Sequence, residues 1–149
     1  MQVTRYFDRF PTFEHDTSAP ILVEFKRLSL HRNWKIDSKR YRKNLRACLR
    51  EEFSHHYGTN QSRLDYWQSL CMEVGVLPAP STITQCKKAL NTVYVNIVDL
   101  IDSRRTGVPV ISFPSKRALR SYSKTQNKIF PKAEAKRDGF VKVLLIDML

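Results

Sequence analysis

The chain has 149 residues, a hydrophobic content of 42%, and 26 Lys or Arg against 14 Asp or Glu, giving a formal net charge of +12. This length and composition suit one globular domain and exclude a largely disordered chain. No apolar run approaches the ~20 residues of a membrane span, and the N-terminus lacks the uninterrupted apolar stretch of a signal peptide. We therefore expect a nuclear or cytosolic protein made of a single helical domain, 1–149, in which 1–17 is a loosely packed arm.

Helical periodicity runs through the first half of the chain. We expect a short helical turn and three helices there, at residues 4–10, 19–32, 38–58 and 61–74. Thr17 or Ser18 is placed to cap the helix at 19–32, and Asp37 or Ser38 to cap the helix that Gly58 ends. Trp67 shares the apolar side of the next helix, so it should belong to the core.

The segment 83–103 is the most apolar part of the chain, and we place it at the centre of the fold. Residues 82–85 have the pattern of a capping box, so its helix should begin there. That helix either continues to Arg105 or breaks near 92–96, where β-branched residues crowd.

The last third predicts an extended segment at 108–113, after Gly107, as a lone strand crossing the surface. Helices should follow at 115–125 and from Pro131 to the C-terminus, with Met148 on the apolar side of the second. Together these elements predict an all-α bundle of six to seven helices. The two C-terminal helices have a loose analogy with a helix-turn-helix.

Positive charge is concentrated in two segments, which is typical of a protein that captures a polyanion. Residues 104–149 carry eleven bases and three acids, or +8, and residues 35–58 carry seven bases and three acids, or +4. On the helix at 38–58, four bases fall opposite the apolar side: Lys39, Lys43, Arg46 and Arg50. The candidate contacts of the second segment are Lys116, Arg117, Arg120, Lys124, Lys128, Lys132 and Lys136.

No catalytic signature is present, so we expect neither an enzyme, a cofactor nor a metal site. His55 and His56 have Glu51 and Glu52 at i−4, but no third ligand lies near them in the sequence. The acids at 99 and 102 are neighbours on one helix face and are expected to pair with Arg104, Arg105 or Lys88. The three cysteines have neither disulfide nor zinc spacing, so they should be unpaired.

Short motifs of core and cap residues extend over most of the chain. They are Phe10-Pro11-Thr12-Phe13, Glu24-Phe25-Lys26-Arg27-Leu28, Trp34, Glu52-Phe53, Tyr57-Gly58, Trp67, Leu70-Cys71, Thr84-Gln85-Cys86-Lys87-Lys88-Ala89-Leu90, Val95-Asn96, Asp99-Leu100, Phe130-Pro131-Lys132 and Ala135-Lys136. In these motifs the chain resembles a family of small fungal helical domains. The resemblance implies a self-contained helical module of fungal origin, and it transfers no activity and no binding site.

The function that these patterns favour is non-catalytic binding of nucleic acid through the phosphate backbone, with DNA slightly favoured over RNA. Tyr41 and Tyr122 lie beside basic residues, but they fall on the apolar sides of their helices. This favours contact with a duplex over base stacking. The alternative of a different class is an interaction or scaffold domain that binds an acidic protein segment. A basic secreted or nuclear-targeted effector is a third.

Overall fold

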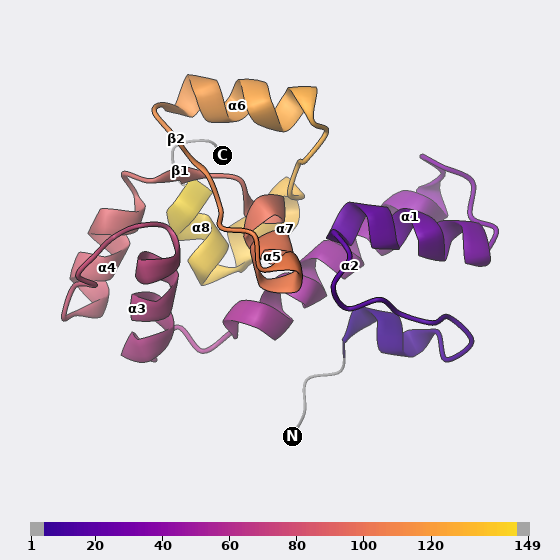
Figure 1. Ribbon diagram of the computed structural model, residues 1–149, viewed down its shortest axis with the longest axis horizontal. Helices are drawn as coiled ribbons and strands as arrows, with labels where there is room; N and C mark the ends of the chain where they lie inside the picture. The colour runs from indigo at the N-terminus through magenta and orange to yellow at the C-terminus, as the bar shows by residue number, and fades with distance from the viewer. Residues whose placement is uncertain (1–4, 146–149) are drawn as a thin grey trace.

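The computed structural model describes residues 5–145, which form eight α-helices, one 3-10 helix (η1) and a two-stranded antiparallel ribbon (Figure 1). The elements are η1 Tyr6–Arg9, α1 Ile21–His31, α2 Lys39–Tyr57, α3 Leu64–Glu73, α4 Ile83–Leu90, β1 Tyr94–Val95, α5 Ile97–Thr106, β2 Ser112–Phe113, α6 Lys116–Thr125, α7 Lys132–Arg137 and α8 Gly139–Leu145. The predicted all-α class is confirmed, although this part of the chain holds more helices than the six or seven expected.

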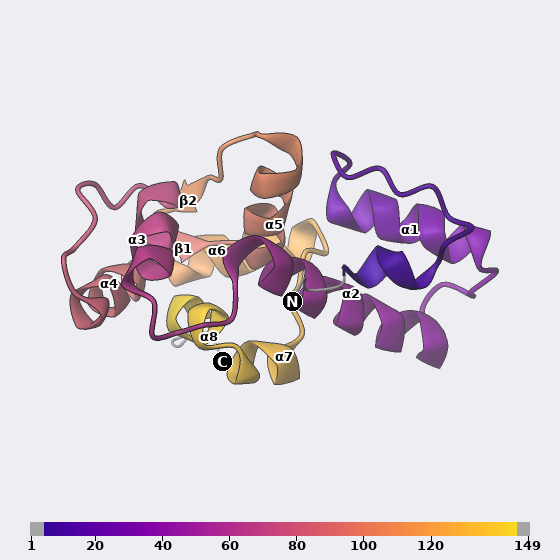
Figure 2. The same ribbon diagram turned by 90° about the horizontal axis from the view of Figure 1, so that it is seen from below.

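Helix α2 is the element that joins the two halves of the fold (Figures 1 and 2). Its first turns pack against η1 and α1, where Tyr41 meets Phe25 with ring centroids 5.1 Å apart. Its last turns pack against α5, where the Tyr57 hydroxyl donates to the Leu100 carbonyl over 2.8 Å. The expectation that the segment 83–103 forms the centre is therefore half right. Its second part, α5, lies against α1 and α2, while α4 packs on α3 and α8 at the edge.

The N-terminal residues are part of the core, so the expectation of a loosely packed arm is wrong for 5–17. Four aromatic side chains anchor this stretch, and each is at most 9% exposed: Tyr6, Phe7, Phe10 and Phe13. Burial of such large apolar surfaces holds the stretch against α1 and α2. Neither Thr17 nor Ser18 caps α1, because Ser18 instead hydrogen-bonds Asp16 and the N-cap position falls on Pro20.

The apolar segment breaks where the β-branched residues crowd, which was one of the two expected outcomes. Asn96 caps α5 by accepting a hydrogen bond from the Asp99 backbone N–H over 3.0 Å. The break leaves β1 extended, and β1 pairs antiparallel with β2 in the register Tyr94 to Phe113. The lone strand expected at 108–113 is therefore wrong: only its last two residues form a strand, and that strand has a partner that satisfies its backbone groups.

The C-terminal part forms two short helices in place of the single helix expected after Pro131. Asp138 is extended and ends α7, and its Oδ1 accepts hydrogen bonds from the backbone N–H groups of Phe140 and Val141 at 2.9 and 3.0 Å. Gly139 fits this corner because a Cβ there would overlap the side chain of Gln61. Met148, predicted on the apolar side, lies outside the described residues.

The core around α3 follows the prediction. Trp67 is fully buried, its ring lies 4.5 Å from that of Phe140, and its Nε1 donates to the Gln61 carbonyl over 2.8 Å. The three cysteines are buried and free, as expected. None of the helices within residues 5–145 combines the length and apolarity that a bilayer crossing requires.

Candidate nucleic-acid interface

The first half of α2 carries five exposed bases, which we call the α2 surface: Lys39, Arg40, Arg42, Lys43 and Arg46. The other side of the helix holds buried residues such as Leu49 and Phe53. Ser38 starts the helix by accepting a hydrogen bond from the Tyr41 N–H over 3.2 Å, and the first turn holds no acid. None of the five bases forms an ion pair with another residue in 5–145. The α2 surface is therefore a row of cations open to solvent.

The fourth base predicted for this helix, Arg50, does not belong to that surface. It is half-buried, and its Nη1 lies 3.2 Å from Glu134 Oε1 on α7. Its Nη2 lies 3.7 Å from Glu51 Oε2. Arg50 therefore ties α2 to α7 and has acids to neutralise it. Arg40 and Arg42 belong to the surface but fall outside the narrow stripe that helical periodicity defined, because only one side of this half of α2 is covered.

Helix α6 carries the second cationic surface, which we call the α6 surface: Lys116, Arg117, Arg120 and Lys124, all exposed. The helix contains no acid, and Ser115 caps it by accepting a hydrogen bond from the Ala118 N–H over 3.1 Å. Its other side buries Leu119 and places Tyr122 against Phe113, with ring centroids 4.7 Å apart. These contacts seat α6 on the β1–β2 ribbon, whereas α7 packs mainly on α8. The expected resemblance to a helix-turn-helix pair is therefore not supported.

Lys128, predicted as a phosphate contact, is held by an acid. Its Nζ lies 2.8 Å from Asp99 Oδ1 and donates to the Tyr122 hydroxyl over 3.1 Å, while that hydroxyl donates to Asp99 Oδ2 over 2.7 Å. Burial and the hydrogen bond to Asp99 raise the pKa of Tyr122 above its usual value. The ion pair with Asp99 therefore neutralises the positive charge of Lys128. Asp99 and Asp102 were expected to pair with Arg104, Arg105 or Lys88, and this prediction is wrong. Asp99 instead contacts Lys128 and Tyr122, and Asp102 accepts a hydrogen bond from the Ile21 N–H over 2.7 Å.

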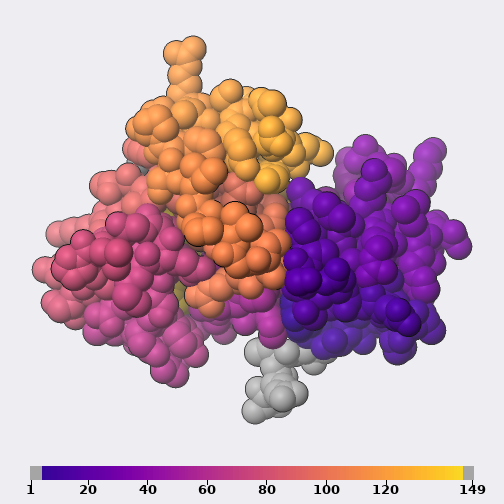
Figure 3. Space-filling model, viewed as in Figure 1, coloured from indigo at the N-terminus to yellow at the C-terminus, as the bar shows by residue number. Residues whose placement is uncertain are grey.

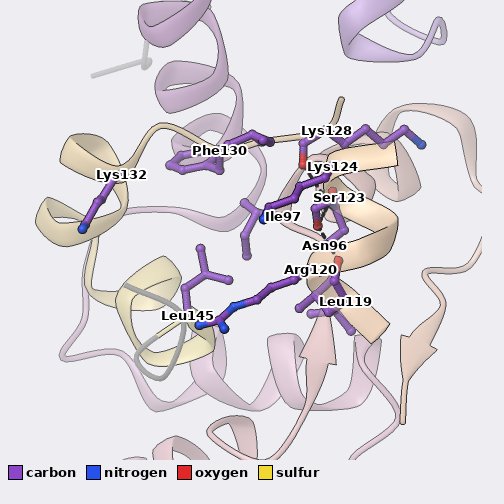
Figure 4. Close-up of a pocket in the computed structure, with 12 residues that line it drawn as sticks. Asn96, Ile97, Leu119, Arg120, Ser123, Lys124, Lys128, Phe130, Lys132 and Leu145 are labelled. Carbon is purple, nitrogen blue, oxygen red and sulfur yellow. Dashed lines mark hydrogen bonds between the residues drawn. The ribbon is translucent and has the colours of Figure 1, made fainter. Parts of the chain in front are cut away.

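A cavity of about 380 Å³ lies between α6, the start of α5 and the end of α8 (Figure 4). Its walls are mostly apolar, and four of the predicted cations stand around it: Arg120, Lys124, Lys128 and Lys132. In Figure 4, Arg120 and Lys124 extend from α6 across the cavity, whereas the ammonium groups of Lys128 and Lys132 point away from it. Lys132 and Lys136 are exposed on α7.

The two cationic surfaces lie in different halves of the molecule. Figures 1 and 2 both place α6 over the half that contains α3, α4 and α8, while the first turns of α2 lie in the half that contains η1 and α1. In the space-filling view, α6 forms a raised rim, and a notch separates it from the N-terminal helices (Figure 3). A ligand that touches both surfaces must therefore be long, or must bend around the molecule.

A buried charge network that was not predicted from the sequence lies behind α2. Glu52 is fully buried and accepts hydrogen bonds from Arg5 at 3.1 and 2.9 Å and from Arg105 at 2.8 Å. Burial alone would raise the pKa of Glu52, but contacts with His56 and Arg5 and the charge of Arg105 hold it well below its usual value. Arg105 also donates to the carbonyl groups of Asp16 and Ala19, at 2.8 and 2.6 Å. The network joins the N-terminal stretch, α2 and α5, so its role is structural.

The two adjacent histidines sit at the edge of this network. His56 Nε2 lies 3.4 Å from Glu52 Oε2, and the two imidazole rings are nearly perpendicular, with centroids 4.9 Å apart. Burial and the charge of Arg5 lower the pKa of His55. The Glu52 carboxylate is therefore hydrogen-bonded to two arginines and lies next to His56.

Comparisons with models of protein families, with curated proteins and with solved structures give no match. The resemblance to small fungal helical domains therefore stays a prediction.

Proposed function

We propose that the protein binds nucleic acid through the phosphate backbone and without catalysis, using the α2 surface and the α6 surface. The observation that carries this proposal is the arrangement of nine exposed bases, five on α2 and four on α6. Neither stretch contains an acid. Exposed rows of Lys and Arg in stretches of sequence without an acid attract phosphates and release their counterions, which is the main source of sequence-independent affinity.

The position of these bases within their helices supports the same proposal. Both helices begin with a base, at Lys39 and Lys116, and neither has an acid in its first turn. The helix macrodipole makes the N-terminus positive, so cations there are unfavourable for folding. The same arrangement adds the field of the helix to that of the side chains and strengthens the attraction for an anion. A stability cost combined with a gain in anion binding is typical of a functional surface.

A duplex is the expected form of the ligand, with DNA slightly favoured over RNA. Single-strand binding relies on exposed aromatic rings on which bases stack. Among residues 5–145, every Phe, Tyr and Trp side chain is buried or partly buried. Tyr41 packs on Phe25, and Tyr122 is held by Asp99. A nuclear or cytosolic location, where such a ligand is found, is part of the same proposal.

Charge reversal on one surface at a time tests the proposal. The α2 variant carries Lys39→Glu, Lys43→Glu and Arg46→Glu, and the α6 variant carries Arg117→Glu, Arg120→Glu and Lys124→Glu. The control variant has the same change in net charge from exposed lysines on three other helices: Lys26→Glu, Lys88→Glu and Lys142→Glu. Affinity for a labelled duplex is measured by fluorescence anisotropy between about 50 and 200 mM salt.

Each cationic-surface variant should bind more weakly than the control variant and show a flatter dependence of log K on log salt. Loss of three phosphate contacts removes about 2.7 from that slope on duplex DNA, at about 0.9 per contact. If all three variants lose affinity equally, only net charge matters and the two surfaces are not the binding site. If none changes affinity, the proposal fails. An acidic protein segment, which the same cations would attract, is then the next candidate.

A further inference from the structure

The cavity beside α6 has walls that offer an apolar surface and no unused neutral polar group. Its apolar lining comes from Val95, Ile97, Leu119, Ile129, Phe130 and Leu145. The two neutral polar residues in the lining already have partners. Asn96 donates from its Nδ2 to Ser123 Oγ at 3.0 Å and to the Lys128 carbonyl at 2.9 Å. Ser123 in turn donates to the Leu119 carbonyl over 2.8 Å.

The charged groups that face the cavity are cations. Arg120 reaches across it toward Leu145, and Lys124 toward Ile97 (Figure 4). None of the described residues that line the cavity is acidic. The aliphatic stems of Arg and Lys pack well on apolar surface while their charged ends stay accessible. An anionic group placed between these two ends therefore meets two charges, next to an apolar space.

These features select the chemistry of a ligand. A volume of about 380 Å³ falls in the range of small-molecule sites, roughly 300–1,000 Å³. A nucleobase is a poor occupant because the lining side chains include no acid and no unused neutral acceptor for its N–H groups, and unpaired buried polar groups are costly. An aliphatic chain needs no such partners.

We propose that this cavity binds a small anionic amphiphile, with its aliphatic chain against Ile97, Leu119 and Leu145 and its anionic head between Arg120 and Lys124. The head is a carboxylate or a phosphate, because both cations suit either group. This proposal does not rest on the proposed binding of nucleic acid, although Arg120 and Lys124 belong to both sites.

A chain-length series on the unaltered protein tests the apolar half of the proposal. Hexanoate, octanoate and decanoate are titrated by calorimetry, with octyl phosphate, octanol and inorganic phosphate alongside. Each added methylene should raise affinity about fourfold until the cavity is filled. Octanoate and octyl phosphate should bind more tightly than octanol, and inorganic phosphate should bind far more weakly than octyl phosphate. Affinity that does not depend on chain length, or no saturable binding, overturns the proposal.

Two matched pairs of variants test the position of the ligand. Arg120→Gln should weaken octanoate by about tenfold, the loss expected for a hydrogen bond to a charged group. Arg117→Gln, on the same helix but outside the cavity lining, should leave it unchanged. Ile129 lines the cavity and Ile111 does not, so Ile129→Trp should obstruct the cavity and Ile111→Trp should not; the two isoleucines are 58% and 68% exposed.

The same variants separate this site from the proposed function. Ile129→Trp should abolish octanoate binding and leave affinity for the duplex unchanged, since it removes no charge. Duplex affinity should fall with either Arg117→Gln or Arg120→Gln. Equal loss of octanoate in both arginine variants means that charge alone attracts the ligand, which contradicts a site in the cavity.

Discussion

Reversing the charge of Lys39 should stabilise the fold and weaken the binding of nucleic acid. Lys39 is the first residue of α2, is exposed, and has four further bases beside it in the α2 surface. A cation at a helix N-terminus opposes the macrodipole, and an anion there is favoured, each by about 0.3–1 kcal/mol. Lys39→Glu makes both changes, so the free energy of unfolding should rise by about 0.6–2 kcal/mol.

This gain should be visible in a thermal melt. For a domain of this size, 1 kcal/mol corresponds to about 2–4 °C in Tm, so the variant should melt a few degrees above the parent when followed by circular dichroism. In the anisotropy assay it should lose about one phosphate contact, which flattens the slope of log K against log salt by about 0.9. A purely structural role for Lys39 does not produce opposite changes in stability and affinity.

Lys88→Glu is the matched control. Lys88 is exposed in the last turn of α4, where the macrodipole favours a cation, and it lies outside both cationic surfaces. Its reversal should lower Tm slightly and leave duplex affinity nearly unchanged. A Lys39→Glu variant that melts at a lower temperature refutes the dipole argument. One that melts higher and binds as tightly as the parent refutes the assignment of the α2 surface to binding.

Four further predictions concern the fold. Trp67→Ala should cost about 3–5 kcal/mol in chemical denaturation, because it empties a fully buried site; parent-like stability would refute the core assignment. Glu52→Gln should cost about 3–5 kcal/mol, because it leaves the buried Arg105 unpaired. The lowered pKa values of His15 and His55, both due first to burial, and of Glu52 mean that each group stabilises the fold above its unfolded pKa. Stability should therefore begin to fall below about pH 6.5 and fall further below about pH 4.3; a flat profile from neutral to acid pH would contradict this. Thiol titration of denatured, unreduced protein should count three free cysteines, and a count of one would reveal a disulfide.

Local signals were enough to predict most helices. Ser38, Thr82 and Ser115 each accept a hydrogen bond from an N–H of the first turn, as such residues do at helix starts. Gly107 ends α5 with φ of 80°, a conformation that glycine adopts without strain.

The predictions that were wrong concern segments whose structure depends on contacts with residues far away in the sequence. The N-terminal stretch reads as polar because its aromatics are separated by charged residues, and only the fold shows that η1 and α1 bring them together. The pairing of β1 with β2 depends on the return of the chain after α5.

The candidate site also has a part that could be predicted from the sequence and a part that could not. Helical periodicity identified three of the five exposed bases on α2, because they lie opposite its apolar side, but it missed Arg40 and Arg42. It could not identify the bases that meet an acid in space. Arg50 meets Glu134 and Lys128 meets Asp99, at sequence separations that no local pattern encodes. The cavity beside α6 likewise depends on the approach of α8 to α6.

The salt dependence of duplex binding tests the central claim most directly. If α6 and α2 both contact phosphates, with nine exposed bases between them, log K should fall linearly with log salt. The slope for duplex DNA should lie between about −4, for contact through one surface, and about −8, for contact through both. No binding to duplex DNA or RNA at low salt, or an affinity that does not change with salt, would contradict the account.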